Sequence, residues 1–314
     1  MAAGAWKTGW MRIAVTGSTG LIGSALVRSL LVDEHEVIRL VRPGAQAGQL
    51  PDGTVGVAWD PAKEQIDAAA LEGLDAVVHL AGAGVGDKRW TPSYKDQIME
   101  SRRLGTCTLA RALAGLDRPP AVLVSASAMG YYGQTGDRPV TEEAPPGTDF
   151  LAKVCRVWEA SADPAREAGI RVVHPRTGLV FDKAGGAAAK LLPLFRLGLG
   201  GRLGNGAQYW SLISLADEVG AIRFLLEDDE VSGPVNLTAP TPVTNAELTA
   251  ELGRQLRRPT VIPVPSFALR VALGEMAVEV IGSQRVLPGV LEQAGYRFRH
   301  PTMPDIVAAG LGSS

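Results

Sequence analysis

Residues 12–23 read RIAVTGSTGLIG, and this stretch decides the fold class. A short apolar strand pattern leads into three glycines, Gly17, Gly20 and Gly23. Apolar residues then recur three and four apart over 21–31, which predicts a helix. Glycines at this spacing permit a tight turn, let a pyrophosphate approach the backbone and let the helix pack closely on the strand. The pattern is informative because it lies between a strand and a helix, although a purely structural turn is the alternative.

Short β-branched runs alternate with helical patterns along the first 180 residues or so. The strand candidates are 12–16, 36–41, 55–59, 75–81, 121–127 and 171–181, and helical patterns include 21–31 and 102–113. Strands that are apolar almost throughout and are separated by helices are typical of a parallel sheet covered on both faces. The sequence therefore predicts an α/β fold with a doubly wound parallel sheet.

The last third of the chain has a different pattern. A helix is expected over 215–226 and a strand over 234–239, Thr244 and Glu247 form a capping-box pattern, and 265–282 is again helical. We therefore expect a dinucleotide-binding core and a smaller C-terminal substrate lobe that closes over the carboxyl edge of the sheet. The core is assigned to 11–181 with 213–239, and the lobe to 182–212 and 240–314.

Composition excludes several classes of protein. The 314 residues carry 31 Lys and Arg against 33 Asp and Glu, a net charge of −2, whereas nucleic-acid platforms usually show a basic excess. Two Cys and four scattered His give neither a disulfide scaffold nor a metal site. No secretory signal is seen at the N-terminus, and no run reaches the ~18 apolar residues of a membrane span. We expect a cytoplasmic protein with no membrane or nucleic-acid partner.

The end of the second strand candidate indicates which dinucleotide is bound. NAD sites place an acidic residue about 20 positions after the glycine turn, but no such acid occurs here until Asp52. A guanidinium can clamp a 2′-phosphate, so we predict NADP(H) with Arg42 on that phosphate. Solvated strand-edge charges are the alternative for Arg39 and Arg42. Asp60 is placed to accept from the adenine amino group, with a plain turn aspartate as the alternative. The cofactor contacts expected from the glycine turn and the helix after it are Gly17, Thr19, Gly20, Leu21, Ile22 and Gly23.

Further motifs follow in a fixed order along the chain. They are HLAGAGVGDKRW (79–90), SRRLGT (101–106), SASAMGYYG (125–133), FRLGLGG (195–201), GEMA (274–277), QRVLP (284–288) and GYRFRHP (295–301). With GSTGLIG they resemble the short-chain dehydrogenase/reductase superfamily, and within it the atypical branch called epimerase family protein, or nucleoside-diphosphate-sugar epimerase-like. The resemblance runs from about residue 11 to 309. It implies an NADP-binding Rossmann core with a smaller closing lobe.

The resemblance also implies particular cofactor contacts. These are Leu80, Ala81, Gly82, Gln97, Arg102, Ser125, Arg176 and Thr177. Two positions depart from the pattern of the relatives, because Gln97 stands where they often have Glu and Ser214 where they have His.

The catalytic pair of the superfamily, Tyr-x-x-x-Lys, is missing. The helix after the fifth strand aligns Leu151 and Cys155 with that pair, and the other frames give Phe150/Val154 or Asp149/Lys153. Hydride transfer to a ketone then needs another proton donor. The candidates lie in the SASAMGYYG loop and are Ser127, Tyr131 and Tyr132, although Tyr132 often packs locally in such proteins. Cys155 as a nucleophile is the weaker alternative, since a lone cysteine on a helix is usually core.

Possible substrate contacts lie in two loops. Lys88, Arg89 and Trp90 follow the fourth strand, and the later candidates are Asn205, Trp210 and Arg285. The alternative for the first loop is a solvated loop with a buried Trp90. The alternative for the later stretch, with Asn205 and Trp210, is packing of a closing loop. We expect an NADP(H)-dependent oxidoreductase or isomerase acting on a nucleotide-sugar-like or small carbonyl substrate, as a monomer or homodimer. A protein that senses NADPH without turnover is the competing hypothesis.

Overall fold

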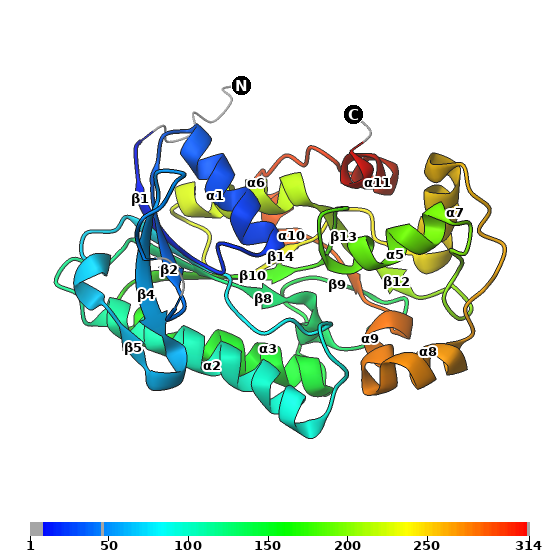
Figure 1. The fold of residues 1–314 in the computed structure, drawn as a ribbon, viewed down its shortest axis with the longest axis horizontal. Helices are drawn as coiled ribbons and strands as arrows, with labels where there is room; N and C mark the ends of the chain where they lie inside the picture. Colours follow the sequence, from blue (N-terminus) through cyan, green and yellow to red (C-terminus); the bar gives the residue numbers. More distant parts are fainter. Residues whose placement is uncertain (1–8, 45–46, 313–314) are drawn as a thin grey trace.

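The computed structural model describes residues 9–44 and 47–312, and a mostly parallel sheet with helices on both faces forms its centre (Figure 1). The strands lie in the order β14-β10-β7-β6-β1-β2-β4-β3, and β3 is antiparallel to its neighbour. Their bounds are β1 Arg12–Thr16, β2 Glu36–Val41, β3 Gly48–Gln49, β4 Val55–Asp60, β6 Ala76–His79, β7 Val122–Ser125, β10 Arg171–Thr177 and β14 Gly233–Leu237. Two short strands, β5 (Gln65–Ile66) and β8 (Ser127–Ala128), pair with β4 and β10. The predicted doubly wound sheet is confirmed.

The order of the strands reverses at β1. From β1 the chain moves to β2 and β4 on one side and then returns to β6, β7, β10 and β14 on the other. The register places Thr16, the last residue of β1, beside Leu40 of β2 and His79 of β6. In sheets of this kind ligands bind in the crevice outside the carboxyl ends of the strands at this reversal.

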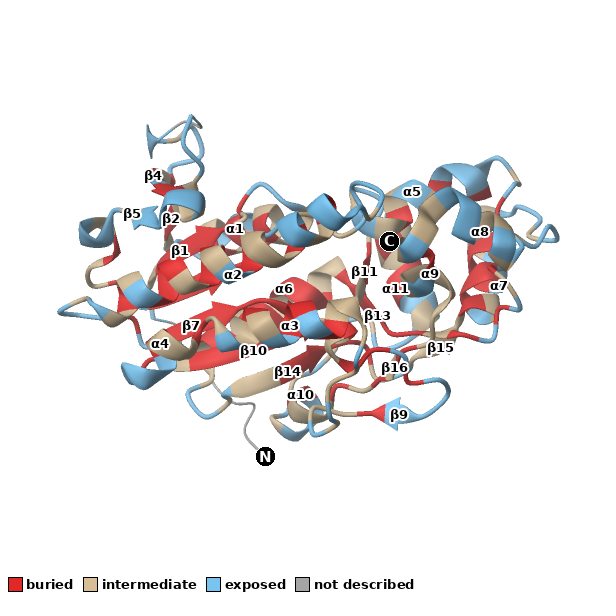
Figure 2. Ribbon diagram, turned by 90° about the horizontal axis from the view of Figure 1, so that it is seen from below, coloured by how far each residue is buried: buried red, intermediate tan, exposed pale blue. Residues whose placement is uncertain are grey.

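Helices cover the two faces of the sheet as separate layers. They are α1 Leu21–Val32, α2 Pro92–Ala114, α3 Phe150–Ala160, α4 Asp163–Glu167 and α6 Leu215–Glu227. Successive strand residues face opposite layers: Ile13 and Val15 pack in the core with α1 and α6, whereas Ala14 packs with α2 and α4. Figure 2 shows the buried residues concentrated in the strands and on the inner faces of these helices.

Apart from η1 (Pro61–Lys63) and η2 (Ala68–Leu71), which lie on the side of β4, the remaining elements lie toward the carboxyl edge of the sheet and beyond it (Figure 1). They are η3 Met129–Tyr132, β9 Pro139–Val140, β11 Leu179–Phe181, α5 Gly186–Arg196, β12 Tyr209–Trp210, β13 Leu212–Ser214, β15 Val243–Thr244, α7 Asn245–Leu256, α8 Ser266–Leu273, η4 Gly274–Met276, α9 Ala277–Ile281, β16 Arg285–Val286, α10 Gly289–Gln293 and α11 Met303–Leu311. Phe181, Leu192, Trp210, Leu248 and Ile306 share one core cluster there. The division of the chain into a core and a lobe stays a prediction. None of the helices in the described part is long and apolar enough to span a bilayer.

Two expected elements are interrupted at glycines. The strand expected over 171–181 breaks at Gly178, where a Cβ atom would lie 2.6 Å from the Ser211 carbonyl oxygen. The helix expected over 265–282 divides at Gly274, whose φ of +63° is unfavourable for other residues. Both predictions were therefore too long, because a run of apolar residues does not reveal where the backbone must turn.

Side-chain caps set two helix starts. The capping box predicted at Thr244 and Glu247 is confirmed at the start of α7. The helix expected over 102–113 begins earlier, at Pro92, where the Thr91 side chain accepts a hydrogen bond from the Tyr94 amide. The sequence contains this cap, but the first turns of α2 are polar. The apolar spacing that predicts a helix therefore appears only further along the chain.

Candidate dinucleotide-binding site

The glycine turn after β1 is shaped by backbone contacts. Gly17 has a φ of +65°, and a Cβ atom on it would lie 2.9 Å from the Leu80 carbonyl carbon. A Cβ atom on Gly23 would lie 2.2 Å from the Gly17 carbonyl oxygen. At Gly20 the nearest atom to such a Cβ would be that same oxygen at 3.3 Å, and no other contact within 4 Å is found among the described residues. Packing within the protein therefore requires glycine at positions 17 and 23, whereas position 20 is exposed and crowded only by the Gly17 carbonyl oxygen among the described residues.

The N-terminus of α1 is suited to an anion. Its N-cap residue, Gly20, makes no side-chain capping bond, and the first turn contains no acidic residue. The free N–H groups and the positive end of the helix dipole are therefore available to phosphate oxygens. Thr19 and Gly20 are exposed, and Leu21 and Ile22 are half-buried at this end. These features fit the pyrophosphate of a dinucleotide.

One threonine ties the two strands at the reversal together. The Thr16 Oγ1 atom accepts hydrogen bonds from the Leu80 amide at 3.0 Å and the Ala81 amide at 3.1 Å, and lies 2.8 Å from His79 Nδ1. Burial lowers the pKa of His79 to about 4, so this imidazole is neutral at pH 7. These hydrogen bonds therefore hold the floor of the crevice in place, and His79 adds no charge to it.

Arg42 is the free cation at the end of β2. It is exposed and forms no ion pair with the residues that the structure describes. The neighbouring Arg39 is instead bonded to Asp52, in line with the alternative of a strand-edge charge for that residue. Asp60 ends β4 with its carboxylate 3.5 Å from Lys63 Nζ. Arg42 thus keeps its donors available, and its contact with a 2′-phosphate stays a prediction.

Beyond β6 the chain passes over Arg102 of α2. A Cβ atom on Gly82 would lie 3.3 Å from the Arg102 Cζ atom, and Arg102 Nη1 donates to the Ala83 carbonyl at 2.9 Å. Gln97 is exposed on the same helix, one turn before Ser101, whose hydroxyl accepts from the Ala83 amide. The structure therefore brings Leu80, Ala81, Gly82 and Arg102 to the crevice and leaves Gln97 at the surface.

Arg176, at the end of β10, lies in a buried polar network. Its Nε and Nη2 atoms donate to the two oxygens of Glu159 at 2.8 and 2.9 Å, and its Nη1 atom donates to the Tyr132 hydroxyl at 3.0 Å. The Tyr132 hydroxyl in turn donates to Asn236 Oδ1 at 2.7 Å. Burial alone would lower the pKa of Arg176, but the bonds to Glu159 outweigh it and raise the pKa. The Arg176 side chain is thus bound within the protein.

The other predicted residues at these strand ends are buried or half-buried. Thr177 Oγ1 donates to Glu218 at 2.8 Å, and Ser127 Oγ donates to Glu159 at 2.7 Å. The Ser125 hydroxyl is enclosed and has no partner among the described residues. Burial raises the pKa of Glu218 to about 8. Cofactor contacts from Ser125, Arg176 and Thr177 stay predictions.

The face of α3 that meets the loop after β7 is apolar at the positions of the missing pair. A Cβ atom on Gly130 would lie 3.2 Å from the Leu151 Cβ atom and 3.9 Å from the Cys155 sulfur. Lys153 is exposed and points elsewhere, so the geometry favours the frame with Leu151 and Cys155. Burial raises the pKa of Cys155 to about 12, and its thiol lies 3.6 Å from the Ala128 carbonyl. A thiolate nucleophile at this position is disfavoured.

The candidate acids differ in their surroundings. Tyr132 is buried, and burial raises its pKa to about 12. The hydroxyl of Ser127 is bonded to Glu159. Tyr131 is half-buried with its ring 3.4 Å from the Arg176 Cζ atom, and its hydroxyl has no partner within the described residues. Of the three, Tyr131 has the most available hydroxyl.

The predicted substrate residues of the first loop make contacts within the protein. Arg89 Nη2 donates to the Val271 carbonyl at 3.1 Å. Trp90 Nε1 donates to the Val85 carbonyl at 2.9 Å, and its ring packs edge-on against Phe150. Lys88 is exposed, 5.6 Å from the Tyr94 ring. This loop therefore joins α2 to α8. Of its two cations, Arg89 is hydrogen-bonded within the protein, whereas Lys88 forms no hydrogen bond or ion pair with the described residues.

The later substrate candidates are also engaged. Trp210 is buried in the core with Leu192 and Leu248. Asn205 accepts from the Ala207 amide in a turn. Arg285 donates to the Asp137 carbonyl at 3.1 Å and lies over the Tyr209 ring. Substrate contacts from these residues stay predictions, and the alternative of closing-loop packing describes Trp210 better.

Ser214, the departure noted in the sequence, caps α6. Its hydroxyl accepts from the Asp217 amide at 3.0 Å and donates to the Asp217 carboxylate at 2.9 Å. His300 of the C-terminal segment brings its Nδ1 atom to 2.9 Å from the same hydroxyl. Asp217 also accepts from the Arg299 and His300 amides at 2.7 and 2.9 Å. An imidazole therefore lies beside this position, supplied from another part of the chain.

Two carboxylates are given no role in the sequence analysis. Glu159 joins Ser127 to Arg176. Glu279 lies in α9, and burial and the nearby Asp149 raise its pKa to about 7. The signal that could have found Glu159 is that a glutamate stands at a helix position that otherwise faces the core. For Glu279 the sequence offers no signal beyond its spacing from Glu275.

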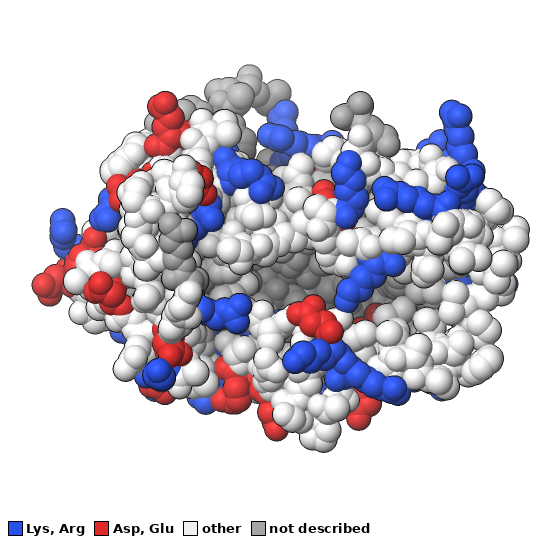
Figure 3. Space-filling view, in the orientation of Figure 1, with Lys and Arg blue, Asp and Glu red and all other residues white. Residues whose placement is uncertain are grey.

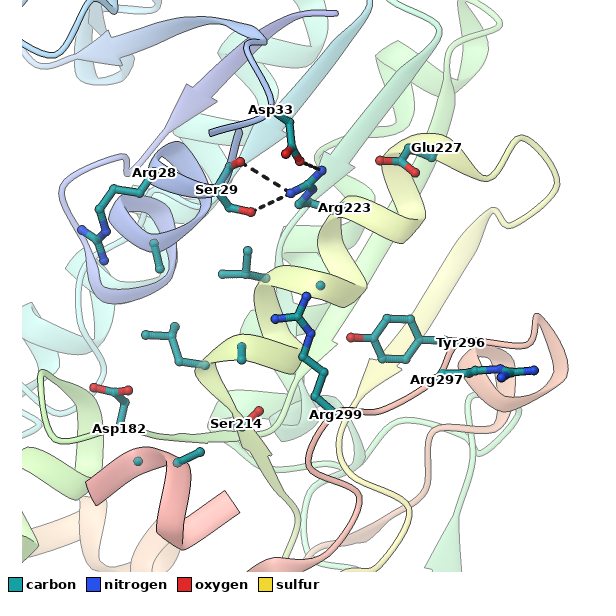
Figure 4. A pocket seen from close by; sticks show the side chains of 17 residues that line it. Arg28, Ser29, Asp33, Asp182, Ser214, Arg223, Glu227, Tyr296, Arg297 and Arg299 are labelled. Atoms are coloured by element: carbon teal, nitrogen blue, oxygen red, sulfur yellow. Dashed lines mark hydrogen bonds and ion pairs between the residues drawn. The ribbon is translucent and has the colours of Figure 1, made fainter. Parts of the chain in front are cut away.

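The surface near the carboxyl edge is hollowed. Figure 3 shows the hollow between the sheet and the helices α5 and α9, with Lys and Arg side chains around its rim. A separate groove of about 650 Å³ lies behind α1, between α1, α6 and the C-terminal segment (Figure 4). There Arg223 bonds to Ser29 and Asp33, while Arg28 and Arg299 extend without an ion pair to the described residues.

The fold and the crevice at the glycine turn, between β1 and β6, define a dinucleotide-binding α/β protein of the short-chain dehydrogenase/reductase type. Comparison with known proteins is more specific. The sequence profile of the NAD dependent epimerase/dehydratase family matches residues 13–237, and a domain of unknown function, DUF1731, matches 264–309. The chain belongs to the NAD dependent epimerase/dehydratase family, so the resemblance seen in the sequence is confirmed.

Several relatives match over almost the whole chain. An epimerase family protein of Mycobacterium tuberculosis is 46% identical over 93% of this chain and 95% of its own length. A chloroplastic epimerase family protein SDR39U1 homolog of Arabidopsis thaliana is 38% identical over 96% of this chain and 87% of its own. These similarities place the chain among the epimerase family proteins.

Two solved structures are similar in fold and sequence. Human epimerase family protein SDR39U1, crystallised with NADPH, has a TM-score of 0.86 and 31% identity, and the match covers 97% of this chain and all of that one. A nucleoside-diphosphate sugar epimerase from Corynebacterium glutamicum has a TM-score of 0.79 and 36% identity over 98% of this chain. This chain spans 59% of the length of that Corynebacterium protein.

Proposed function

We propose that this chain binds NADP(H) in the crevice between β1 and β6. The observation that carries the proposal is the glycine turn, where Gly20 is exposed in front of the uncapped N-terminus of α1. Phosphate groups are favoured there because backbone N–H groups and the helix dipole act together. The human relative crystallised with NADPH supports the same assignment.

The preference for NADP(H) over NAD(H) rests on Arg42. Its guanidinium is exposed at the end of β2, where an NAD site would carry a carboxylate, and it forms no ion pair with the described residues. The planar guanidinium can bind a 2′-phosphate through two hydrogen bonds. Asp60, at the end of the next strand, is the proposed acceptor for the adenine amino group.

Calorimetric titration of the wild-type protein and of Arg42→Ala with NADPH and NADH tests this proposal. We expect Arg42→Ala to weaken NADPH binding at least about tenfold and to leave NADH binding nearly unchanged, because a charge-assisted pair contributes about 1.5–3 kcal/mol. Arg39→Ala is the matched control, since Arg39 is already bonded to Asp52. Equal losses for the two cofactors would refute the role of Arg42.

We further propose that the protein is an oxidoreductase or isomerase acting on a nucleotide-sugar-like or small carbonyl substrate. The bound dinucleotide would supply hydride exchange, and the chain would hold a proton at a hydroxyl of the loop after β7. Among Ser127, Tyr131 and Tyr132, the geometry favours Tyr131, because its hydroxyl has no partner among the described residues. Tyr131→Phe should then lower turnover while leaving NADPH affinity unchanged.

A second function, sensing of NADPH without turnover, is favoured by the apolar face of α3. Leu151 and Cys155 lie at the positions closest to Gly130, so these two positions offer no acid or base of suitable pKa. Incubation of the protein and NADPH with a panel of nucleotide sugars and small carbonyls distinguishes the two functions. Cofactor oxidation or epimer formation supports the enzyme, and binding of NADPH without any conversion supports the sensor.

A further inference from the structure

Exposed apolar side chains concentrate in one part of the protein. Two segments, 190–203 and 257–273, contain seven of the ten large apolar side chains that are exposed in the described part of the chain. They are Leu194, Leu197, Leu199, Val261, Ile262, Phe267 and Val271. Val261 is 82% exposed, and Leu197, Phe267 and Val271 are each 72% exposed. Large apolar side chains gathered in this way mark a surface that contacts a partner or a membrane.

The two segments lie side by side. Gly201 and Val261 form an antiparallel bridge, and the Val264 amide donates to the Arg202 carbonyl at 2.9 Å. Arg258 Nε donates to the Arg196 carbonyl, also at 2.9 Å. The exposed apolar side chains therefore belong to one region of the surface, and we call residues 190–203 and 257–273 the patch.

The helix α8 shows how little of the patch is covered. None of its eight residues is buried, whereas a surface helix normally buries its apolar face against the core. Leu269 packs partly on the core cluster that contains Leu248. Phe267 and Val271 lie two positions to either side of it, which in a helix is the opposite face. This outer face of α8 therefore has no covering element among the described residues.

The patch is also basic. It contains six of the chain's 31 Lys and Arg residues and none of its 33 Asp and Glu residues. The six are Lys190, Arg196, Arg202, Arg257, Arg258 and Arg270, and all of them are exposed. The acidic residues that flank the second segment, Glu251 and Glu275, are bonded to Arg254 and Lys95 outside the patch. In Figure 3 the right-hand end of the molecule, over α7 and α8, presents Lys and Arg side chains beside uncharged ones. The positive charge is local, because the whole chain has a net charge of −2.

This combination fits an anionic lipid surface better than a second copy of the chain. Projecting apolar side chains can enter the boundary between lipid head groups and acyl chains, which requires no complementary pocket. Arg270 lies beside Phe267 and Val271 on the same face of α8. Its guanidinium can therefore reach a lipid phosphate while its aliphatic stem stays in the apolar layer. A second copy would instead bring six like charges against these six.

We infer that the patch docks on a membrane surface that carries anionic lipids. Phe267 and Val271 enter the lipid boundary, and the exposed arginines bind the phosphates of the head groups. The expectation of no membrane partner rests on the lack of a secretory signal and of an apolar run long enough to span a bilayer. Docking at the surface needs neither. The inference is independent of the dinucleotide site.

Sedimentation of the protein with lipid vesicles tests the inference. We expect it to bind phosphatidylcholine vesicles that contain phosphatidylglycerol at least about tenfold more tightly than vesicles of phosphatidylcholine alone, and less tightly as the salt concentration rises. Arg202→Gln with Arg270→Gln should weaken binding to the anionic vesicles about tenfold, because each cation near such a surface contributes to binding. Phe267→Ser with Val271→Ser should weaken it by a similar factor, because both side chains lose their place in the apolar layer.

Val32→Ser and Arg28→Gln are the matched controls, since both residues are exposed on α1, outside the patch, and should leave binding unchanged. Leu197→Ser with Leu199→Ser is a second apolar variant, for the case in which the pair on α8 fails to fold. No preference for the anionic vesicles, or folded patch variants that bind like the wild type, overturns the inference. A wild-type dimer in light scattering that Phe267→Ser with Val271→Ser dissociates also overturns it, because a second copy would then occupy the patch.

Discussion

The buried pair of Arg176 and Glu159 allows one stability prediction to be worked out in detail. The two side chains are 3% and 14% exposed and are joined by two hydrogen bonds of 2.8 and 2.9 Å. Glu159→Gln removes the negative charge and one of the acceptors and leaves the guanidinium buried without a counter-charge. Breaking a buried pair in this way costs about 3–5 kcal/mol. The free energy of unfolding should fall by that amount.

Urea unfolding followed by circular dichroism measures this change. Glu100→Gln is the matched control, because Glu100 forms an exposed pair with Arg103 that is worth about 0–1 kcal/mol. The double variant Glu159→Leu with Arg176→Met should recover part of the loss, since it leaves no unpaired buried charge. A loss below about 1 kcal/mol for Glu159→Gln would show that the pair is already screened by solvent and that the network does not organise the strand ends.

Two further predictions concern buried groups. Burial raises the pKa of Glu218 from 4.5 to about 8, so the folded protein keeps a proton that the unfolded chain releases, and stability should fall as the pH rises from about 4.5 to 8. Glu218→Gln should flatten this fall in a series of Tm measurements, and an unchanged slope would contradict the assignment. Cys155, whose pKa is about 12, should resist a thiol reagent in the native protein. The half-buried Cys107 should account for the native reactivity, and Cys107→Ser should abolish it; rapid labelling of that variant would be the contrary result.

The parts of the molecule that follow local rules could be predicted from the sequence. The patterns that predict the glycine turn, the parallel sheet and the capping box at Thr244 each lie in residues close together in the chain, and all three features are found in the structure. Pattern and spacing are sufficient there, because hydrogen bonds and steric limits act within a few residues.

Side-chain networks could not be predicted in the same way. Tyr132 bonds to Asn236, 104 positions away, and Arg176 to Glu159 and Tyr132. Each of these polar residues satisfies its hydrogen-bonding groups inside the protein, and this depends on the packing of several elements. For the same reason, the contacts that Arg89 and Arg285 make within the protein could not be predicted from the sequence, and their contacts with a substrate stay predictions.

The central claim is that the turn at Gly20 holds a pyrophosphate, and one variant tests it directly. Gly20 has a φ of −74°, and among the described residues a Cβ atom on it would approach only the Gly17 carbonyl oxygen, at 3.3 Å, so Gly20→Ala should fold with a Tm near that of the wild type. The added methyl group would occupy the space through which the phosphates approach. Calorimetric titration with NADPH should therefore show binding weakened at least about tenfold, or about 1.4 kcal/mol, in a protein of unchanged stability. Equal NADPH affinity in the wild type and in Gly20→Ala would contradict the account.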